Sequence, residues 1–146
     1  MESPKSSFYE WDEKSTYIKN PPFFKSTEKE LPVINNIKDA YVLLNMGDSI
    51  TTDHISPAGK IISNSPCGRY LKENGVESKD FNTYGARRGN YKAMERGTFA
   101  NTRLINKMVD KVGPDTMHIP SNKKMAVWDA AEQYMNEDKD LIVFAG

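Results

Sequence analysis

Short apolar runs, separated by polar stretches that contain glycine and proline, set the pattern of this chain. The runs at 40–44 and 141–146 are continuous, as in strands that are buried on both faces. Residues 127–136 place apolar side chains on one face of a predicted helix, and residues 117–119 form a predicted short strand before Pro120. Because predicted strands alternate with predicted helices, the pattern indicates an α/β or α+β fold.

Further helices are predicted from the residues at their ends. Ser65 suits the N-cap of a helix that ends before Gly75, a left-handed stop. A second helix is predicted over 90–96, with Gly97 closing it. The apolar residues of 98–109 also recur at helical spacing, so we expect an amphipathic helix there.

Residues 1–36 are expected to form an extended arm, and residues 37–146 the folded domain. Prolines interrupt the arm, and helical periodicity is absent from it. The arm nevertheless holds more aromatic residues than a disordered tail usually carries: Phe8, Tyr9, Trp11, Tyr17, Phe23 and Phe24. We therefore expect the arm to pack against this domain or against a partner domain.

The composition narrows the classes of function. Hydrophobic residues make up 38% and charged residues 27% of the 146 residues, as in a soluble globular domain. Basic and acidic residues balance at 20 each, so there is no overall attraction to nucleic acid or to anionic membranes. Apolar runs fall short of the roughly 20 residues of a membrane span. The single cysteine, Cys67, offers neither an internal disulfide nor a metal site, and it favours a reducing compartment.

Residues 47–59 hold the densest group of chemically active side chains. A carboxylate, an imidazole and several hydroxyls follow the first predicted strand in a loop with Gly and Pro, which presents polar groups at a rigid edge. Asp53 is a candidate site residue, and Thr52 and Ser56 are candidate hydrogen-bond donors. Ordinary turn chemistry is the alternative for all three. For His54 we favour a structural role.

A second candidate group lies at 84–90, where Arg87 and Arg88 stand between glycines. A planar guanidinium binds a carboxylate or a phosphate in bidentate fashion, and neighbouring glycines allow a ligand to approach closely. The alternative is a solvated surface patch. The sequence therefore suggests the hypothesis that this protein has a pocket that binds carboxylates.

Several segments of the chain together carry a family resemblance. They are residues 11–24, 47–61, 64–71, 80–90, 94–103 and 127–131. These segments closely resemble the aconitase/iron regulatory protein family, in particular aconitate hydratases of the cytosolic type. The resemblance covers nearly the whole chain and implies the family's C-terminal swivel domain, a three-layer β/β/α module, here with an extended N-terminal arm.

The resemblance implies a lyase reaction of the tricarboxylic acid cycle, in which citrate and isocitrate interconvert through cis-aconitate. Asp53 would be the active-site aspartate. Arg88, with Arg87 beside it, would bind substrate carboxylates, and Thr52 and Ser56 would donate hydrogen bonds. A 4Fe-4S cluster would be held by the other domains of the parent chain, with no cofactor or metal ligands in this segment. The family's catalytic serine follows a strand like 141–146, so we expect a domain shortened at its C-terminus and inactive as an isolated fragment.

Iron regulatory proteins of the same family provide the alternative function. Without the cluster, they bind iron-responsive hairpin RNA, and here Arg87 and Arg88 would grip the RNA. One departure bears on activity: relatives often carry an Arg-Gly pair where this chain has Asn74-Gly75. We expect a cytoplasmic protein, with the mitochondrion as the alternative location and no membrane partner.

Overall fold

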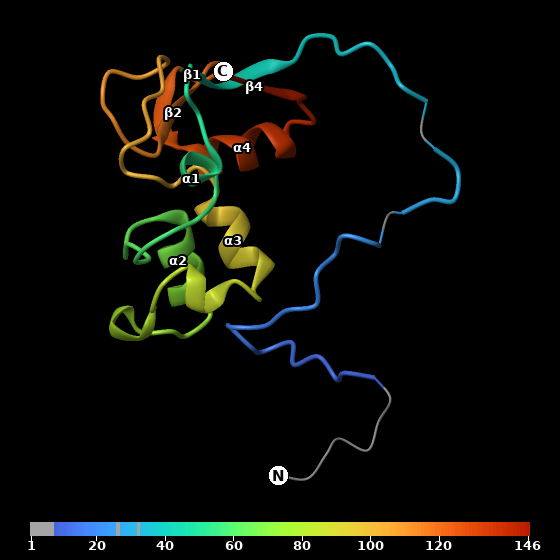
Figure 1. Cartoon of the computed structure of the whole chain (residues 1–146), viewed down its shortest axis with the longest axis vertical. Coiled ribbons are helices and arrows are strands. Elements are labelled where there is room, and N and C mark those ends of the chain that lie inside the picture. Colours follow the sequence, from blue (N-terminus) through green and yellow to red (C-terminus); the bar gives the residue numbers. More distant parts are fainter. Residues whose placement is uncertain (1–7, 26, 32) are drawn as a thin grey trace.

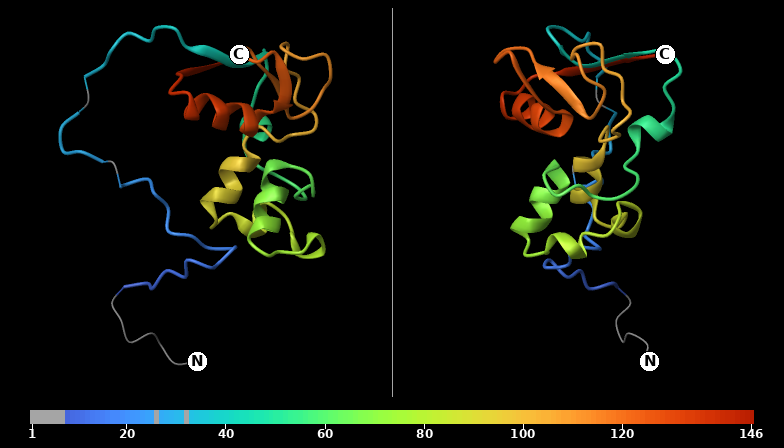
Figure 2. Two further views of the ribbon diagram at one scale, coloured as in Figure 1. Left: turned by 180° about the vertical axis from the view of Figure 1, so that it is seen from behind. Right: turned by 90° about the vertical axis from the view of Figure 1, so that its left-hand side faces the viewer.

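The computed structural model describes residues 8–25, 27–31 and 33–146. Two lobes lie one above the other, and the N-terminal arm passes the lower lobe before it turns out and up to the first strand (Figures 1 and 2). The regular elements, in chain order, are β1 (Tyr41–Gly47), α1 (Thr52–Ile55), α2 (Pro66–Glu73), α3 (Tyr91–Gly97), β2 (Asp115–His118), β3 (Lys123–Ala126), α4 (Val127–Asn136) and β4 (Leu141–Ala145). Short 3₁₀ turns span Ser78–Asp80 and Gly85–Arg87. The expected mixed α/β fold is confirmed.

The upper lobe combines two small sheets with α4. β1 pairs in parallel with β4, and β2 pairs in antiparallel fashion with β3. β2 is joined to β1 by the buried Thr116 hydroxyl, which donates to the Leu43 carbonyl at 2.6 Å. One face of α4 completes a core that is built from the following buried residues: Leu43, Leu44, Met46, Leu104, Val127, Ala130 and Tyr134.

β4 forms where the apolar run predicts it, but the expectation that it is buried is wrong. Val143 is 40% exposed and Phe144 is 52% exposed. Within the described residues, β4 pairs with β1 along one edge and no strand pairs with the other. Phe144, expected in the core, therefore presents an apolar surface to the outside.

The lower lobe is built on α2 and α3, and the caps of α2 follow the sequence signals. The Ser65 hydroxyl accepts a hydrogen bond from the Gly68 amide at 3.1 Å, and Gly75 takes the left-handed φ of 77° beyond the end of α2. The Asn90 side chain caps α3 by accepting from the amides of Lys92 and Ala93. The lobe's core consists of Ile61, Cys67, Tyr70, Leu71, Phe81, Tyr84 and Ala93.

Gly97 has a different role from the predicted one. It is the last residue of α3 and does not adopt a left-handed φ. It is buried, and a Cβ at this position would collide with the Tyr84 ring and approach Pro57 Cβ to 2.8 Å. The glycine is therefore needed for close packing of α3 and not for stopping it.

The predicted helix over 98–109 is absent, and turns replace it. Tertiary contacts override the local pattern: the Phe99 amide donates to the Ile55 carbonyl at 2.9 Å, and the Lys107 amide donates to the Asn45 carbonyl at 2.8 Å. Phe99 itself has a φ of 59°, which a helix does not allow. The segment thereby ties α1 to the edge of β1.

The described part of the arm has no helix or strand, and it packs against the lower lobe where Thr16 and Tyr17 contact Arg87. Farther along, Leu31, Val33 and Ile34 are each more than 80% exposed. Pro4 and the other residues 1–7 lie outside the described residues. In the part of the chain that the structure describes, none of the helices has the length and apolar character needed to cross a membrane.

Burial of Cys67 and Tyr84 predicts a loss of stability at alkaline pH. Desolvation raises the pKa of the Cys67 thiol from 9.0 to about 11 and that of the Tyr84 hydroxyl from 10.0 to about 12. The unfolded chain releases these protons at lower pH than the folded chain does. The contribution of the two groups to the free energy of unfolding is therefore fully present below about pH 9, and it is lost as the pH rises toward about 12. Urea unfolding of wild type and Cys67→Ala between about pH 8 and about pH 11 measures this. The free energy of unfolding should fall less steeply with pH in the variant than in wild type. An equal fall in the two proteins would mean that Cys67 does not contribute to the pH dependence.

Candidate functional site

α1, a single helical turn, carries Asp53 to the end of β1. The Thr51 amide donates to His54 Nδ1 at 3.0 Å, which caps the turn and agrees with a structural role for His54. The Phe99 amide and the Asn101 side chain hold α1 from the other side, because Asn101 Nδ2 donates to the Asp53 carbonyl at 3.0 Å. The backbone of Asp53 is thus fixed, while its carboxylate has no partner among the described residues.

The carboxyl end of β4 lies against the loop that leads from β1 to α1. The Gly146 amide donates to the Gly47 carbonyl at 2.7 Å, and the Ile50 amide donates to the Gly146 carbonyl at 3.0 Å. A Cβ at Gly146 would come within 2.6 Å of the Asp48 carboxylate. The carboxyl ends of two parallel strands therefore meet beside α1, which is where open α/β folds bind ligands.

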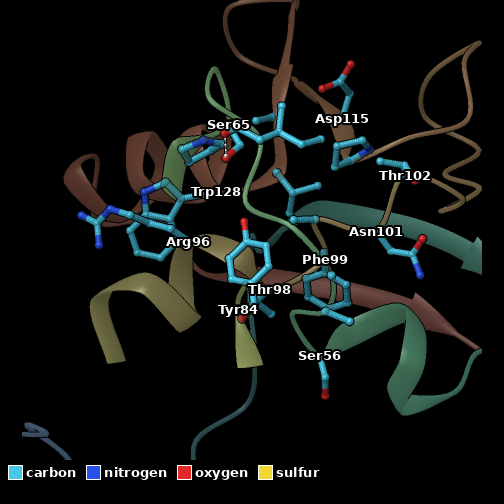
Figure 3. A pocket seen from close by; sticks show the side chains of 18 of the residues that line it. Ser56, Ser65, Tyr84, Arg96, Thr98, Phe99, Asn101, Thr102, Asp115 and Trp128 are labelled. Atoms are coloured by element: carbon cyan, nitrogen blue, oxygen red, sulfur yellow. Dashed lines mark hydrogen bonds between the residues drawn. The ribbon is translucent and has the colours of Figure 1, made fainter. Parts of the chain in front are cut away.

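A cleft of about 660 Å³ opens between the two lobes. It contains Asp53 and Ser56 from the predicted set, at the end near α1. Figure 3 shows Trp128 and Arg96 on one side of the cleft, Asn101 and Thr102 on the other, and Tyr84 between them. The volume is in the range of small-molecule sites.

Arg96 joins the lobes at this cleft, and no pattern in the sequence singles it out. Its guanidinium carbon lies 4.8 Å from the ring centre of Tyr70 and 4.7 Å from that of Trp128. Arg96 Nη1 is 2.7 Å from Glu95 Oε1. Trp128 is a half-buried wall of the cleft, and its ring stacks on this cation.

Arg87 and Arg88 are neighbours with opposite environments. Arg87 is 1% exposed, and its guanidinium donates to the carbonyls of Phe81 (2.7 Å), Thr16 (2.8 Å) and Asp80 (3.0 Å). Arg88 is exposed; its Nε donates to the Gly85 carbonyl at 2.9 Å, and its two terminal nitrogens have no partner among the described residues. The geometry therefore leaves Arg88 available to a ligand and engages Arg87 in the fold.

Arg88 lines a second groove, of about 470 Å³, whose walls come from the arm and from α3. The structure does not bring Asp53 and Arg88 into one cavity: Asp53 lines the interlobe cleft and Arg88 the groove, while Thr98 at the end of α3 lines both. Thr52 lines neither; it is exposed on α1, and its carbonyl accepts from the Ser56 amide at 2.7 Å.

Asn74 ends α2 as its C-cap. Its amide nitrogen Nδ2 donates to the Tyr70 carbonyl at 2.8 Å, so this side chain serves the helix end. An arginine at this position would carry a cation on the surface of the lower lobe. Among the contacts of the described residues, Asn74 makes none with Arg88 or Asp53.

The described residues do not fit an iron–sulfur cluster or another multidentate metal site. They contain no group of three or more His, Cys, Asp or Glu side chains placed to hold a metal ion. Cys67, the one cysteine in the sequence, is fully buried, and burial raises the pKa of its thiol to about 11, which disfavours the thiolate that a cluster needs.

Together these features define an α/β domain in which Asp53 and Arg88 line separate cavities. A family model described as the aconitase C-terminal domain matches residues 67–146, more than half of the chain. The chain belongs to the aconitase family. The matched range includes Arg87 and Arg88, whereas Asp53 lies ahead of it.

Proposed function

We propose that this chain is part of the swivel domain of an aconitate hydratase of the cytosolic type, with residues 37–146 as the domain and 1–36 as its linking arm. Its parent would be a hydro-lyase that interconverts citrate and isocitrate through cis-aconitate in the cytoplasm. The observation that carries the proposal is the exposed guanidinium of Arg88 within the matched family range, whose two terminal nitrogens have no partner among the described residues. A tricarboxylate substrate requires such cations, since two parallel charge-assisted hydrogen bonds fix a carboxylate.

Asp53 and Arg88 would act together once other domains of the parent complete the site. Each lies in its own cavity on the two sides of Thr98, so a substrate that touches both must extend past the end of α3. Asp53 would accept a hydrogen bond, and Ser56 and Thr52 would donate hydrogen bonds from α1 and its end. Arg87 has most of its donors engaged, which supports Arg88 as the substrate arginine.

The iron–sulfur cluster of such an enzyme would be held by the other domains, in keeping with the described residues, which do not fit it. The contribution of this chain is then binding and orientation of substrate. β4 ends beside the loop before α1, so a catalytic loop that continued from this strand would begin next to the Asp53 segment.

Replacing Arg88 by glutamine in the parent enzyme is the direct test. We expect kcat/KM for citrate to fall about 100-fold or more, because two charge-assisted hydrogen bonds to a carboxylate are lost. The measurement is the formation of cis-aconitate, followed by its ultraviolet absorbance, with the cluster reconstituted.

Lys72→Gln is the matched control, since it removes one exposed cation of α2 that lines neither cavity. Its kcat/KM should stay within about twofold of wild type. Equal losses in the two variants would mean that Arg88 acts through general surface charge.

RNA binding is a second candidate function, favoured by the groove around Arg88. That groove combines the cations Arg88 and Lys19 with the rings of Trp11, Phe23 and Tyr91. Cations beside aromatic rings are the set that binds unstacked bases and phosphates of RNA loops. The test is a binding titration of cluster-free parent protein with an iron-responsive hairpin; Arg88→Gln should weaken it, and an unchanged affinity would remove Arg88 from this role.

A further inference from the structure

Residues 12–18 of the arm have a defined local structure. The Ser15 amide donates to the Asp12 carbonyl at 3.1 Å, and the Lys14 amide donates to Asp12 Oδ1 at 2.8 Å. The Ser15 hydroxyl in turn accepts from the Ile18 amide at 3.1 Å. These local hydrogen bonds already restrict the backbone of the segment. It therefore loses less conformational entropy when it docks, and it can dock as a preformed unit.

This unit docks on both sides of Arg88. On one side, the Thr16 carbonyl accepts from Arg87 Nη1 at 2.8 Å, and the Tyr17 ring lies 4.1 Å from the Arg87 guanidinium carbon. On the other side, the Lys19 amide donates to the Gly89 carbonyl at 3.0 Å. Arg88 lies between these two attachment points and is therefore held through its backbone.

Further contacts make the fit close. Asn90 Nδ2 donates to the same Thr16 carbonyl at 2.9 Å. A Cβ at Gly89 would lie 3.0 Å from the Tyr17 carbonyl, which is tighter than most side-chain contacts, so a larger residue would push the arm outward by a few tenths of an ångström. Residues 87, 89 and 90 thus all bond to or contact the arm, while the Arg88 side chain is left for the groove.

The arm also builds half of that groove. Its walls on one side are Trp11, Ile18, Lys19, Pro21 and Phe23, and on the other they are residues of α3 and the turn before it. Without the arm, Arg88 would project from an open surface, where water competes fully for its hydrogen bonds.

We propose that residues 11–23, here called the strap, position Arg88 and complete its groove, so that docking of the strap sets the affinity of this site for a carboxylate-bearing ligand. The role in affinity rests on the proposed function; the positioning does not. The strap residues themselves need not touch the ligand.

Positioning is tested by NMR on this chain with Tyr17→Leu, and with Phe24→Leu as the matched control, because the Phe24 ring is 82% exposed. The Arg88 Nε–H signal, identified by its loss in Arg88→Lys, reports the order of the guanidinium, and exchange of the Lys19 amide reports docking. Tyr17→Leu should speed Lys19 exchange about 3- to 10-fold, the range of a cation–π contact, and make the Arg88 Nε–H more mobile. Phe24→Leu should change neither signal.

Two outcomes of this experiment would overturn the proposal. In one, the Lys19 amide loses protection while the Arg88 signal stays as in wild type, so docking and positioning are separate. In the other, Tyr17→Leu leaves the Lys19 amide protected, so the ring over Arg87 does not hold the strap.

The role in affinity is tested in the parent enzyme by a double-mutant cycle. Tyr17→Leu should raise KM for citrate about 3- to 10-fold with kcat nearly unchanged, and should have no further effect in an Arg88→Gln background. Additive effects would show that the strap acts elsewhere and would contradict the proposal. A parent protein that does not turn over citrate would remove the proposed function, while the NMR result would still decide the positioning.

Discussion

Replacing Arg87 by methionine should lower the free energy of unfolding of this chain by about 2–4 kcal/mol. Methionine fills similar space, but it leaves the Phe81 carbonyl without its donor in the lobe interior, and it also removes the part-buried hydrogen bond to the Asp80 carbonyl. The Thr16 carbonyl keeps one donor from Asn90 and contributes less to the loss. Arg87 is a buried cation with no acidic partner among the described residues, so its removal offsets part of this loss of stability. The loss of its stacking on the Tyr17 ring lowers the stability further.

The measurement is the urea unfolding midpoint, with Arg88→Met as control. Arg88 is exposed and its terminal nitrogens are unpartnered in the described part of the chain, so its replacement should change stability by less than about 0.5 kcal/mol. The unfolding midpoint of Arg87→Lys should lie between those of wild type and Arg87→Met, because the lysine ammonium keeps the charge but lacks the planar set of donors of the guanidinium. Equal midpoints for Arg87→Met and Arg88→Met would contradict the buried role of Arg87.

The second large effect is expected for Gly68→Ala in α2, with a loss of about 2–4 kcal/mol. In an ordinary helix this change would stabilise by about 0.5–1 kcal/mol, because alanine has the higher helix propensity. Here the new Cβ would collide with the Ile62 carbonyl and lie 2.6 Å from the Ser63 carbonyl. Both obstacles are backbone atoms of the segment that crosses α2, so a side-chain rotation cannot relieve them.

Gly85→Ala is the matched control for this prediction. Gly85 also has an ordinary φ, and the nearest atom to its added Cβ is the Thr83 hydroxyl at 3.8 Å. We expect thermal unfolding of Gly85→Ala at or slightly above the wild-type temperature. A Gly68→Ala protein as stable as Gly85→Ala would mean that the crossing segment moves aside at little cost.

Among the helices that the sequence predicted correctly, α2 has signals at both ends, whereas α4 was predicted from its apolar spacing alone. Ser65 and Gly75 act on amides or carbonyls within one helical turn, so a local reading finds them. Residues 98–109 have helical spacing without such signals, and hydrogen bonds to β1 and α1 decide their conformation. The apolar run of β4 predicted a strand correctly and its burial wrongly, because burial depends on which elements cover the strand.

The sequence predicted which residues belong to the candidate site, but it did not predict how they are placed relative to one another. The sequence indicated Asp53 and Arg88, while the structure shows that they line separate cavities with Thr98 common to both. It did not indicate Arg96 or Asn101, whose importance comes from contacts with Trp128 and with the Asp53 carbonyl.

By itself, the sequence determined the α/β class, the caps of α2, and the family resemblance, since each depends on residues close together in the chain. Only the tertiary structure decided which of the two adjacent arginines is free. Arg87 is engaged by the Thr16 carbonyl, 71 residues away, and this bond also brings the arm against Arg88. The environment of a charge is set by whatever segments fold against it, so two identical side chains side by side in the sequence came to differ in burial and in the role that each can play.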